Sequence, residues 1–177
     1  IQAHSSLEHN YLRDGFWAKS LQEELMNPGT TASILVRMED VTDKINAALN
    51  DNMSEQERAE KIKEISRKLE AEAVKGTNLQ ANIKPYFNGN QYFMSIFKIF
   101  RDVRLVGAPN SAIGKFGGDT DNWTWPRHTG DFSVLRIYAG PDNEPAAVSP
   151  NNVPYKPAKF FKVSARGVKE GDFTMVF

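Results

Sequence analysis

The 177-residue sequence predicts a mainly β fold with a helical insertion, an α+β class whose strand pattern is that of half a β-barrel. Three observations lead to this class. Apolar residues alternate with a period of two from Leu79 to Phe100, on both sides of Asn88-Gly89, a preferred hairpin turn. Short apolar, partly β-branched runs occupy 31–41 and 132–138. Between 54 and 76, apolar residues instead recur every three or four positions, as in an amphipathic helix.

The first 29 residues mix apolar and polar side chains without a sustained period. Ser20 is a good helix N-cap, and the two glutamates at 23 and 24 suit a first helical turn, so a short helix is predicted over 21–26. Asn27-Pro28-Gly29 then predicts a turn.

The predicted helical insertion covers about 43–76, within one partial domain over 1–177. It follows a predicted strand at 31–41, and Thr42 is expected to cap a short helix over 43–49. Ser54 and Glu57 form a Ser-x-x-Glu capping box for a longer helix, which Gly76 is expected to close. The apolar stripe of that helix is narrow and its charges balance. We therefore expect it to pack on one side of a core, not to bind a membrane.

Further strands are predicted after this helix. In the second arm of the hairpin both faces are apolar, which suits a barrel strand with the helix packed outside. Pro85 indicates an edge or a bulge in the first arm. The remaining expected elements are strands at 103–106, 132–138, 160–164 and 172–177, with a loop over 140–157.

Composition excludes several classes of partner. Lys+Arg and Asp+Glu both number 22, so the net charge is zero, which argues against nucleic acid or an anionic membrane as the main partner. No apolar run approaches the ~20 residues of a membrane span. There is no cysteine, hence no disulfide or thiolate metal site. Apolar patterns are interrupted at Ile1 and at Phe177, so we expect a piece of a longer protein.

The stretch from Gly117 to Ile137 carries the strongest functional signal. Its first half holds Trp, Arg, Asp and His side chains with no helical or strand period, and Asp131 then opens an apolar run. A polar and aromatic loop that leads into a strong strand is a common way to mount a site on a rigid scaffold. A carboxylate at the first residue of a strand can accept the Nδ1–H of an imidazole, although many structural strands also begin with Asp.

The spacing of oxygen-bearing and histidine side chains argues against a metal site. Asp119, Asp121 and Asn122 supply closely spaced oxygens, but the sixth and twelfth places counted from Asp119 are threonine and glycine, so the EF-hand pattern fails. No metal and no cofactor are expected. His4 and His9 could be a triad base or a metal pair, but they are five apart, which does not place them on one helical face, so surface or packing roles are expected for both.

Three long segments resemble the bacterial dipeptidyl-peptidase 7 and 11 family of serine exopeptidases, which are chymotrypsin-like enzymes. They are GKFGGDTDNWTWPRHTGDFSVLRIYA, the start IQAHSSLEHNYLRDGFWAKSLQEELMNPG, and NNVPYKPAKFFKVSARGVKEGDF near the end. The resemblance implies the N-terminal barrel of the peptidase domain. It also implies release of dipeptides from the free N-terminus of peptide substrates by a Ser-His-Asp mechanism.

Site residues follow from this resemblance position by position. Asp131 matches the triad aspartate, and Asn122 and Trp123 match the pair that binds the substrate's N-terminal amine. The base histidine would lie just upstream of Ile1 and the nucleophilic serine beyond Phe177, so this chain alone is expected to be inactive. The resemblance also implies a periplasmic or cell-surface location in a Gram-negative bacterium, and it is compatible with a homodimer of the full-length enzyme. It leaves open whether the enzyme prefers an acidic or a hydrophobic residue before the cleaved bond.

One alternative from another class remains open. Trp123 and Trp125 could line a non-catalytic module that binds a peptide or a carbohydrate. His128, three residues before Asp131, is a poor triad base, because a base needs its own loop to reach both the aspartate and the serine. Arg127 is expected to tie the loop down by hydrogen bonds, and binding of an oxyanion is the open alternative for it.

Overall fold

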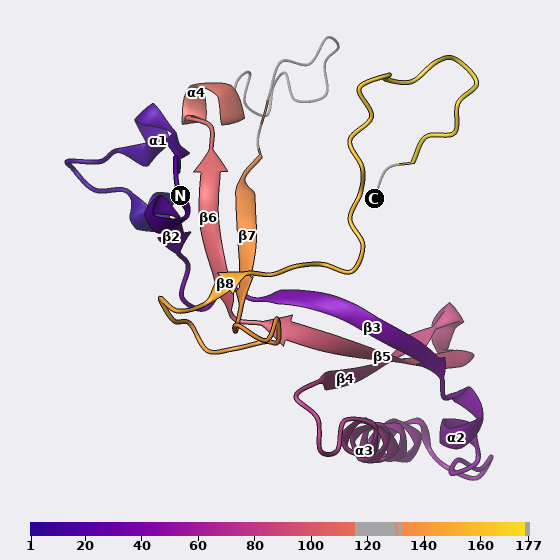
Figure 1. The fold of residues 1–177 in the computed structure, drawn as a ribbon. Coiled ribbons are helices and arrows are strands. Elements are labelled where there is room, and N and C mark those ends of the chain that lie inside the picture. Colours follow the sequence, from indigo (N-terminus) through magenta and orange to yellow (C-terminus); the bar gives the residue numbers. More distant parts are fainter. Residues whose placement is uncertain (116–129, 131, 176–177) are drawn as a thin grey trace.

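Two antiparallel sheets organise the chain in the computed structural model, which describes residues 1–115, 130 and 132–175 (Figure 1). In sheet A, β6 lies between β7 on one side and both β1 and β2 on the other, and β8 pairs with β7. Sheet B has the order β3-β5-β4. The strands are β1 (Phe16–Trp17), β2 (Leu25–Met26), β3 (Ala32–Asp40), β4 (Gln80–Tyr86), β5 (Gln91–Phe100), β6 (Asp102–Ala108), β7 (Val134–Ala139) and β8 (Val153–Pro154).

The helices are few and mostly short, so the predicted mainly β class is confirmed. They are η1 (Gln2–His4), α1 (Tyr11–Asp14), η2 (Leu21–Glu23), α2 (Thr42–Asn46), α3 (Glu55–Ala73), η3 (Phe87–Gly89) and α4 (Ser111–Gly114). The only long one in the described chain, α3, lies with α2 between β3 and β4 in sequence, within the stretch where the sequence predicted helices. No helix in the described residues is both long and apolar enough to cross a membrane.

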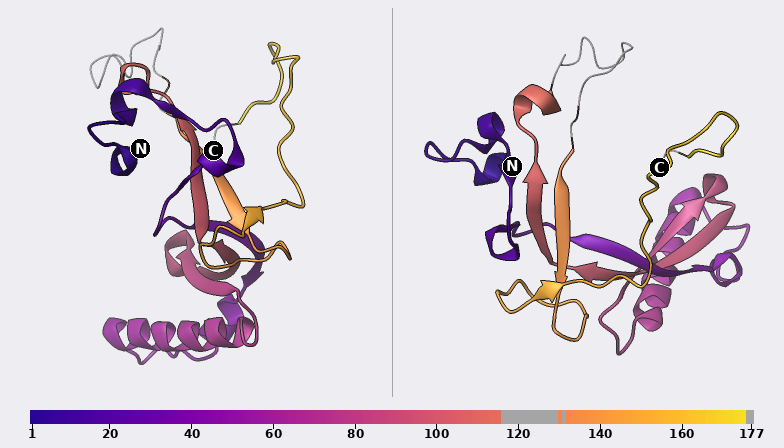
Figure 2. Two further views of the ribbon diagram at one scale, coloured as in Figure 1. Left: turned by 60° about the vertical axis from the view of Figure 1, so that its left-hand side comes forward. Right: turned by 45° about the horizontal axis from the view of Figure 1, so that its top comes forward.

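The two sheets meet at a corner made by one residue. Arg101 alone separates β5 of sheet B from β6 of sheet A, and the two sheets extend in different directions from that point (Figure 2). Phe100 is fully buried there, and its ring lies 4.5 Å from that of Tyr155, centroid to centroid. The corner thus joins the helix-bearing sheet to the sheet that carries the predicted site.

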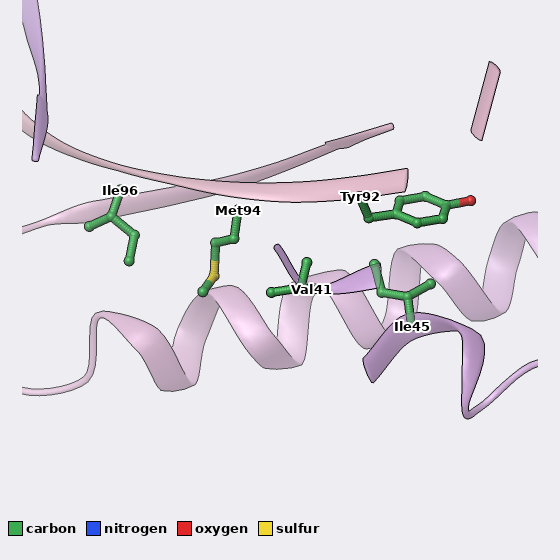
Figure 3. Close-up of a cluster of buried hydrophobic side chains, with 5 residues drawn as sticks. All are labelled: Val41, Ile45, Tyr92, Met94 and Ile96. Atoms are coloured by element: carbon green, nitrogen blue, oxygen red, sulfur yellow. The ribbon is translucent and has the colours of Figure 1, made fainter. Parts of the chain in front are cut away.

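Sheet B and the helices share one hydrophobic cluster, shown in Figure 3. Tyr92, Met94 and Ile96 project from one face of β5 and meet Val41 and Ile45, all five being buried. The stripe of α3 packs against the same cluster through Ile62, Ile65 and Leu69. Each such side chain stabilises the fold by about 1.5–3 kcal/mol when fully buried. The predicted packing of the helix outside the hairpin is confirmed.

Local signals set most of these boundaries. The predicted capping box is present: the Ser54 side chain accepts from the Glu57 backbone, and the Glu57 carboxylate accepts from the Ser54 backbone. The Asn88-Gly89 turn also forms, with positive φ at both residues. Pro85 lies in β4, which pairs only with β5 among the described strands, so the predicted edge position is confirmed.

The two short helices predicted at 43–49 and 21–26 were wrong in their bounds or type. Thr42 is the first residue of α2, not its cap, and its hydroxyl accepts a hydrogen bond from Tyr92 N (2.9 Å). The helix ends at Asn46 instead of 49, and the next residues continue in tighter turns, with Ala48 N donating to Ile45 O and Leu49 N to Asn46 O. Residues 21–26 form the single 3-10 turn η2 followed by β2, not one helix over the whole range, and Ser20 makes no side-chain cap bond. Pairing of Leu25 with Leu105 of β6 outweighs the local helical preference.

The strands predicted at 160–164 and 172–177 were also wrong. No strand forms over 159–175, and residues 176–177 lie outside the described part. Apolar side chains there are largely exposed, with Phe160 at 76% and Val163 at 99%. A strand is stable only when it pairs with a neighbour, and the described chain pairs no strand with this segment. The predicted loop at 140–157 does form, apart from the two residues of β8.

Candidate functional site

The predicted site residues fall in the part of the chain that is not described. Asp131, Asn122 and Trp123 lie outside the described residues, as do Trp125, Arg127 and His128. The site is therefore built from the residues that flank this stretch: α4 and Lys115 before it, and Gly130, Phe132 and Ser133 after it.

The two flanks are tied to each other. Asn110 caps α4, its side chain accepting from Ile113 N (3.1 Å). Ile113 O in turn accepts from Gly130 N (3.1 Å), and a Cβ added to Gly130 would lie 3.3 Å from the Ile113 side chain. Because β6 leads into α4 and pairs with β7, both ends of the 116–129 stretch are anchored at the same end of the β6–β7 pair (Figure 1).

A pocket of about 400 Å³ lies at these anchors. We call it the rim pocket. Its lining combines three parts of the chain, namely the N-terminal segment, the β6–α4 connection and the start of β7. The lining residues are Ile1, Leu12, Asn27, Thr30, Leu105, Ala108, Pro109, Asn110, Ser111, Gly114, Lys115, Phe132, Ser133 and Leu135. Lys115 is the only charged side chain among them. The pocket brings Ile1 together with Phe132 and Ser133, more than 130 positions later in the sequence.

The N-terminal segment is fastened to β6 through Asn27. Its side chain donates to Leu25 O (3.3 Å) and Val103 O (3.4 Å), and its Oδ1 shares a hydrogen bond with His4 Nε2 (2.6 Å). His9 stacks on Tyr11, with ring centroids 6.0 Å apart. Both histidines thus have structural partners, as the sequence indicated. No group of three His, Asp or Glu side chains that could hold a metal occurs in the described residues.

A buried ionic network stabilises the opposite end of β6 and β7, near the corner. Asp102 and Arg104 face the same side of β6 and form a two-point contact, with Arg104 Nε and Nη2 3.0 and 2.9 Å from the carboxylate. Asn152 Nδ2 donates to the same carboxylate (2.9 Å). The Arg104 guanidinium also lies over the Tyr138 ring, 3.7 Å from its centroid.

Glu24 extends this network to the segment before β2. Its carboxylate accepts from Tyr138 Oη (3.0 Å) and from Arg136 Nε (2.8 Å). Burial opposes ionisation of Asp102, but the hydrogen bonds from Arg104 and Asn152 outweigh it, so the pKa of Asp102 lies below its usual value. Burial, and then the bond to Glu24, raise the pKa of Tyr138.

Sequence reasoning missed this network. Part of the signal was present, since Arg136 and Tyr138 stand at i and i+2 in the strand predicted at 132–138, as Asp102 and Arg104 do in β6, but the strand predicted at 103–106 left Asp102 out. Such spacing puts side chains on one face. Only the register, which pairs Asp102 with Tyr138 and Arg104 with Arg136, brings the four together. None of these residues lines the rim pocket, and their contacts join β6 to β7 and β7 to the segment before β2.

A second pocket, of about 430 Å³, lies on sheet B. Its lining comes from β3, β4 and β5, including Leu35, Phe97 and Ile99. Lys84 and Tyr86 are its only titratable side chains, so its lining includes no carboxylate and no imidazole.

Comparison with known proteins gives consistent results. The model of the peptidase S46 family matches residues 1–177. The chain is 51% identical over 177 residues to an Asp/Glu-specific dipeptidyl-peptidase of Capnocytophaga gingivalis, covering all of this chain and 25% of that protein. It is 50% identical over 175 residues to dipeptidyl-peptidase 7 of Porphyromonas endodontalis, covering 99% of this chain and 21% of that protein.

Solved structures agree with these matches. The crystal structure of Porphyromonas endodontalis DPP11 superposes with a TM-score of 0.82 at 47% identity, over 97% of this chain and 25% of that one. The same enzyme in complex with the dipeptide Arg-Glu gives a TM-score of 0.79. The chain therefore spans about a quarter of the length of the relatives it matches, and its curled sheets correspond to a part of that fold.

Proposed function

Because this chain belongs to the peptidase S46 family, we propose that it is part of a serine dipeptidyl-peptidase that releases dipeptides from the free N-terminus of peptides. In the complete enzyme a serine attacks the second peptide bond and a histidine transfers the proton. Asp131 orients that histidine, and backbone N–H groups stabilise the oxyanion. Neither the serine nor the base histidine is assigned to this chain.

The rim pocket is the observation that supports this proposal most directly. The triad requires that the residues before Ile1 and the start of β7 lie together, because the resemblance puts the histidine just before Ile1 and the aspartate at 131. Ile1, Phe132 and Ser133 line one pocket. The proposal further requires the Asp131 carboxylate to face this pocket, beside Ser133, where it could accept the imidazole Nδ1–H.

The proposed amine site consists of Asn122 and Trp123. An N-terminal ammonium needs oxygen acceptors, which an Asn side chain supplies, and an aromatic wall adds cation–π attraction. Both residues belong to the stretch whose two ends are anchored at the rim pocket by α4 and Gly130. A substrate amine held there would place its second peptide bond at a fixed distance from the triad, which is how an exopeptidase measures a dipeptide.

Specificity is not assigned by these residues. The chain matches an Asp/Glu-specific enzyme and a dipeptidyl-peptidase 7 almost equally, at 51% and 50% identity. We propose that the part of the enzyme outside this chain sets the preference before the cleaved bond. A periplasmic or cell-surface location and a homodimeric full-length enzyme complete the proposal, and both derive from the family resemblance.

The test is Asp131→Asn in the full-length enzyme, assayed on fluorogenic dipeptidyl substrates. A wrong histidine tautomer lowers kcat by about 10⁴-fold in serine proteases, so a loss of this order is expected with KM little changed. The isolated 177-residue chain should give no turnover. Full activity of the Asp131→Asn enzyme would exclude the triad role, and a protein with no activity in any form would favour a binding module instead.

A further inference from the structure

We propose that Trp17 is a positioning residue for the active site: its indole lies across Gly107 and contacts Phe132, and so holds the start of the segment that leads into β7. This inference rests on the proposed function, because it concerns the strand that carries the proposed triad carboxylate. It assigns a role to a residue in β1, on the other side of β6 from β7.

The contact between Trp17 and Gly107 is unusually close. Trp17 pairs with Gly107, Phe16 with Ala108, and Ala18 N donates to Val106 O (2.8 Å). A Cβ built on Gly107 would collide with the six-membered ring of Trp17. Glycine at 107 therefore lets the indole lie directly against the β6 backbone, at the point where a register shift between Leu105 and Gly107 interrupts the pairing with β7.

From this position the indole reaches the segment that leads into β7, on the other side of β6. The ring centroids of Trp17 and Phe132 are 6.1 Å apart and their planes are inclined by 53°. Such a tilted aromatic arrangement is favourable and directional. The contact thus bridges β6 from β1 to the residue that directly follows position 131.

Few other restraints act on this stretch. β7 begins at Val134, which pairs with Gly107, so Phe132 and Ser133 precede the paired strand. In the described backbone, Gly130 N donates to Ile113 O and Phe132 N donates to Gly130 O, both at 3.1 Å. The Phe132 ring has one aromatic partner among the described residues, Trp17. Among these contacts, the indole is the one that holds the Phe132 ring from across β6.

Burial does not explain the pair. Trp17 is 54% exposed and Phe132 53%, so each residue keeps about half of its surface in solvent. The contribution of the contact to global stability is correspondingly small, and its main consequence is geometric. Phe132 and Ser133 both line the rim pocket. A displacement of about 1 Å of a catalytic group can cost on the order of 10²-fold in rate.

The experiment uses the full-length enzyme with Trp17→Ala, Trp17→Phe and Gly107→Ala. Trp17→Ala should lower kcat about 10- to 100-fold with KM within about twofold, because a misplaced strand start affects the reacting geometry. Trp17→Phe keeps an aromatic ring and should retain most of the wild-type kcat. Gly107→Ala should act in the same direction as Trp17→Ala, because its methyl displaces the indole. Tyr86→Ala, which removes a ring packed on Phe93 at 5.3 Å in sheet B, is the matched control and should leave kcat unchanged.

A double-mutant cycle separates positioning from a general structural role. If Trp17 acts through Phe132, the double variant Trp17→Ala/Phe132→Ala should have a kcat no lower than that of the slower single variant. The effects of the two substitutions on kcat would then be strongly coupled. The proposal would be overturned if the kcat losses of the two single variants multiply in the double variant, or if Trp17→Ala has the wild-type kcat. It would also be overturned if the lower kcat of Trp17→Ala accompanies a lower Tm and Trp17→Phe restores neither. If Asp131→Asn is fully active, the proposed function has failed; if Asp131→Asn is inactive while Trp17→Ala is normal, only this inference has failed.

Discussion

Replacing Asp102 by alanine should be the most damaging single change to the β6–β7 pair. Asp102 is 1% exposed and its carboxylate accepts from Arg104 at two nitrogens and from Asn152. Without it, the guanidinium of Arg104, whose side chain is 8% exposed, keeps the Ser149 carbonyl (2.9 Å), the Tyr138 ring and the more distant charge of Glu24, but loses its two-point carboxylate contact. Removal of one partner of a buried ion pair costs about 3–5 kcal/mol, because the other charge stays buried.

Native-state hydrogen exchange of β6 and β7 amides in the full-length enzyme would measure this loss as a drop in the free energy of local opening. The double variant Asp102→Leu/Arg104→Met removes both charges and should cost far less than Asp102→Ala, since well-packed apolar pairs often replace a buried ion pair without loss. Asp14→Ala breaks an exposed pair with Arg13 and should have no measurable effect. A loss below about 1 kcal/mol for Asp102→Ala, or a double variant as unstable as the single, would refute the reasoning.

Two further predictions concern stability. Tyr138 has a pKa raised above its ordinary 10.0 by burial and by its bond to Glu24, so its contribution to the free energy of unfolding is complete below about pH 10 and is lost as pH rises through the raised pKa. Tyr138→Phe should flatten this alkaline loss of stability in urea unfolding followed from pH 8 to 12. An unchanged dependence of stability on pH would contradict the assignment. Ser54→Ala removes the acceptor for Glu57 N and should destabilise α3 by about 1 kcal/mol, measured by circular dichroism on heating, with Ser164→Ala in the segment without regular structure as a control.

Local chemistry explains what could be predicted from the sequence. The capping box at Ser54, the Asn88-Gly89 turn and the alternation along β5 each depend on residues within a few positions of one another. All three formed as expected. The apolar stripe of α3 also identified the face that packs on Met94 and Ile96.

Long-range pairing explains what could not. Residues 25–26 join β6 some 80 positions later, a contact that no local preference reveals, so a helix was predicted in place of β2. The opposite error occurred at 160–164, where strand-forming residues have no neighbouring strand in the described chain. For the site, the sequence and the family resemblance named Asp131, Asn122 and Trp123, whereas the structure contributes the rim pocket and the contacts that support it.

The two edges of sheet B have a consequence for the behaviour of this chain in solution. Among the described strands, β3 and β4 each pair on one side only, so a strand from another molecule could add to either, the first step of aggregation. On β4 the outward Ile83 N already donates to Glu70 Oε1 of α3 (2.7 Å), which partly covers that edge. The register shift between Leu35 and Arg37 distorts the β3 edge. In β4, Lys84 carries a charge and Pro85 has no backbone N–H to donate. Smoothing these irregularities, for instance by Pro85→Val, should make filaments or sheet-like oligomers more frequent during expression.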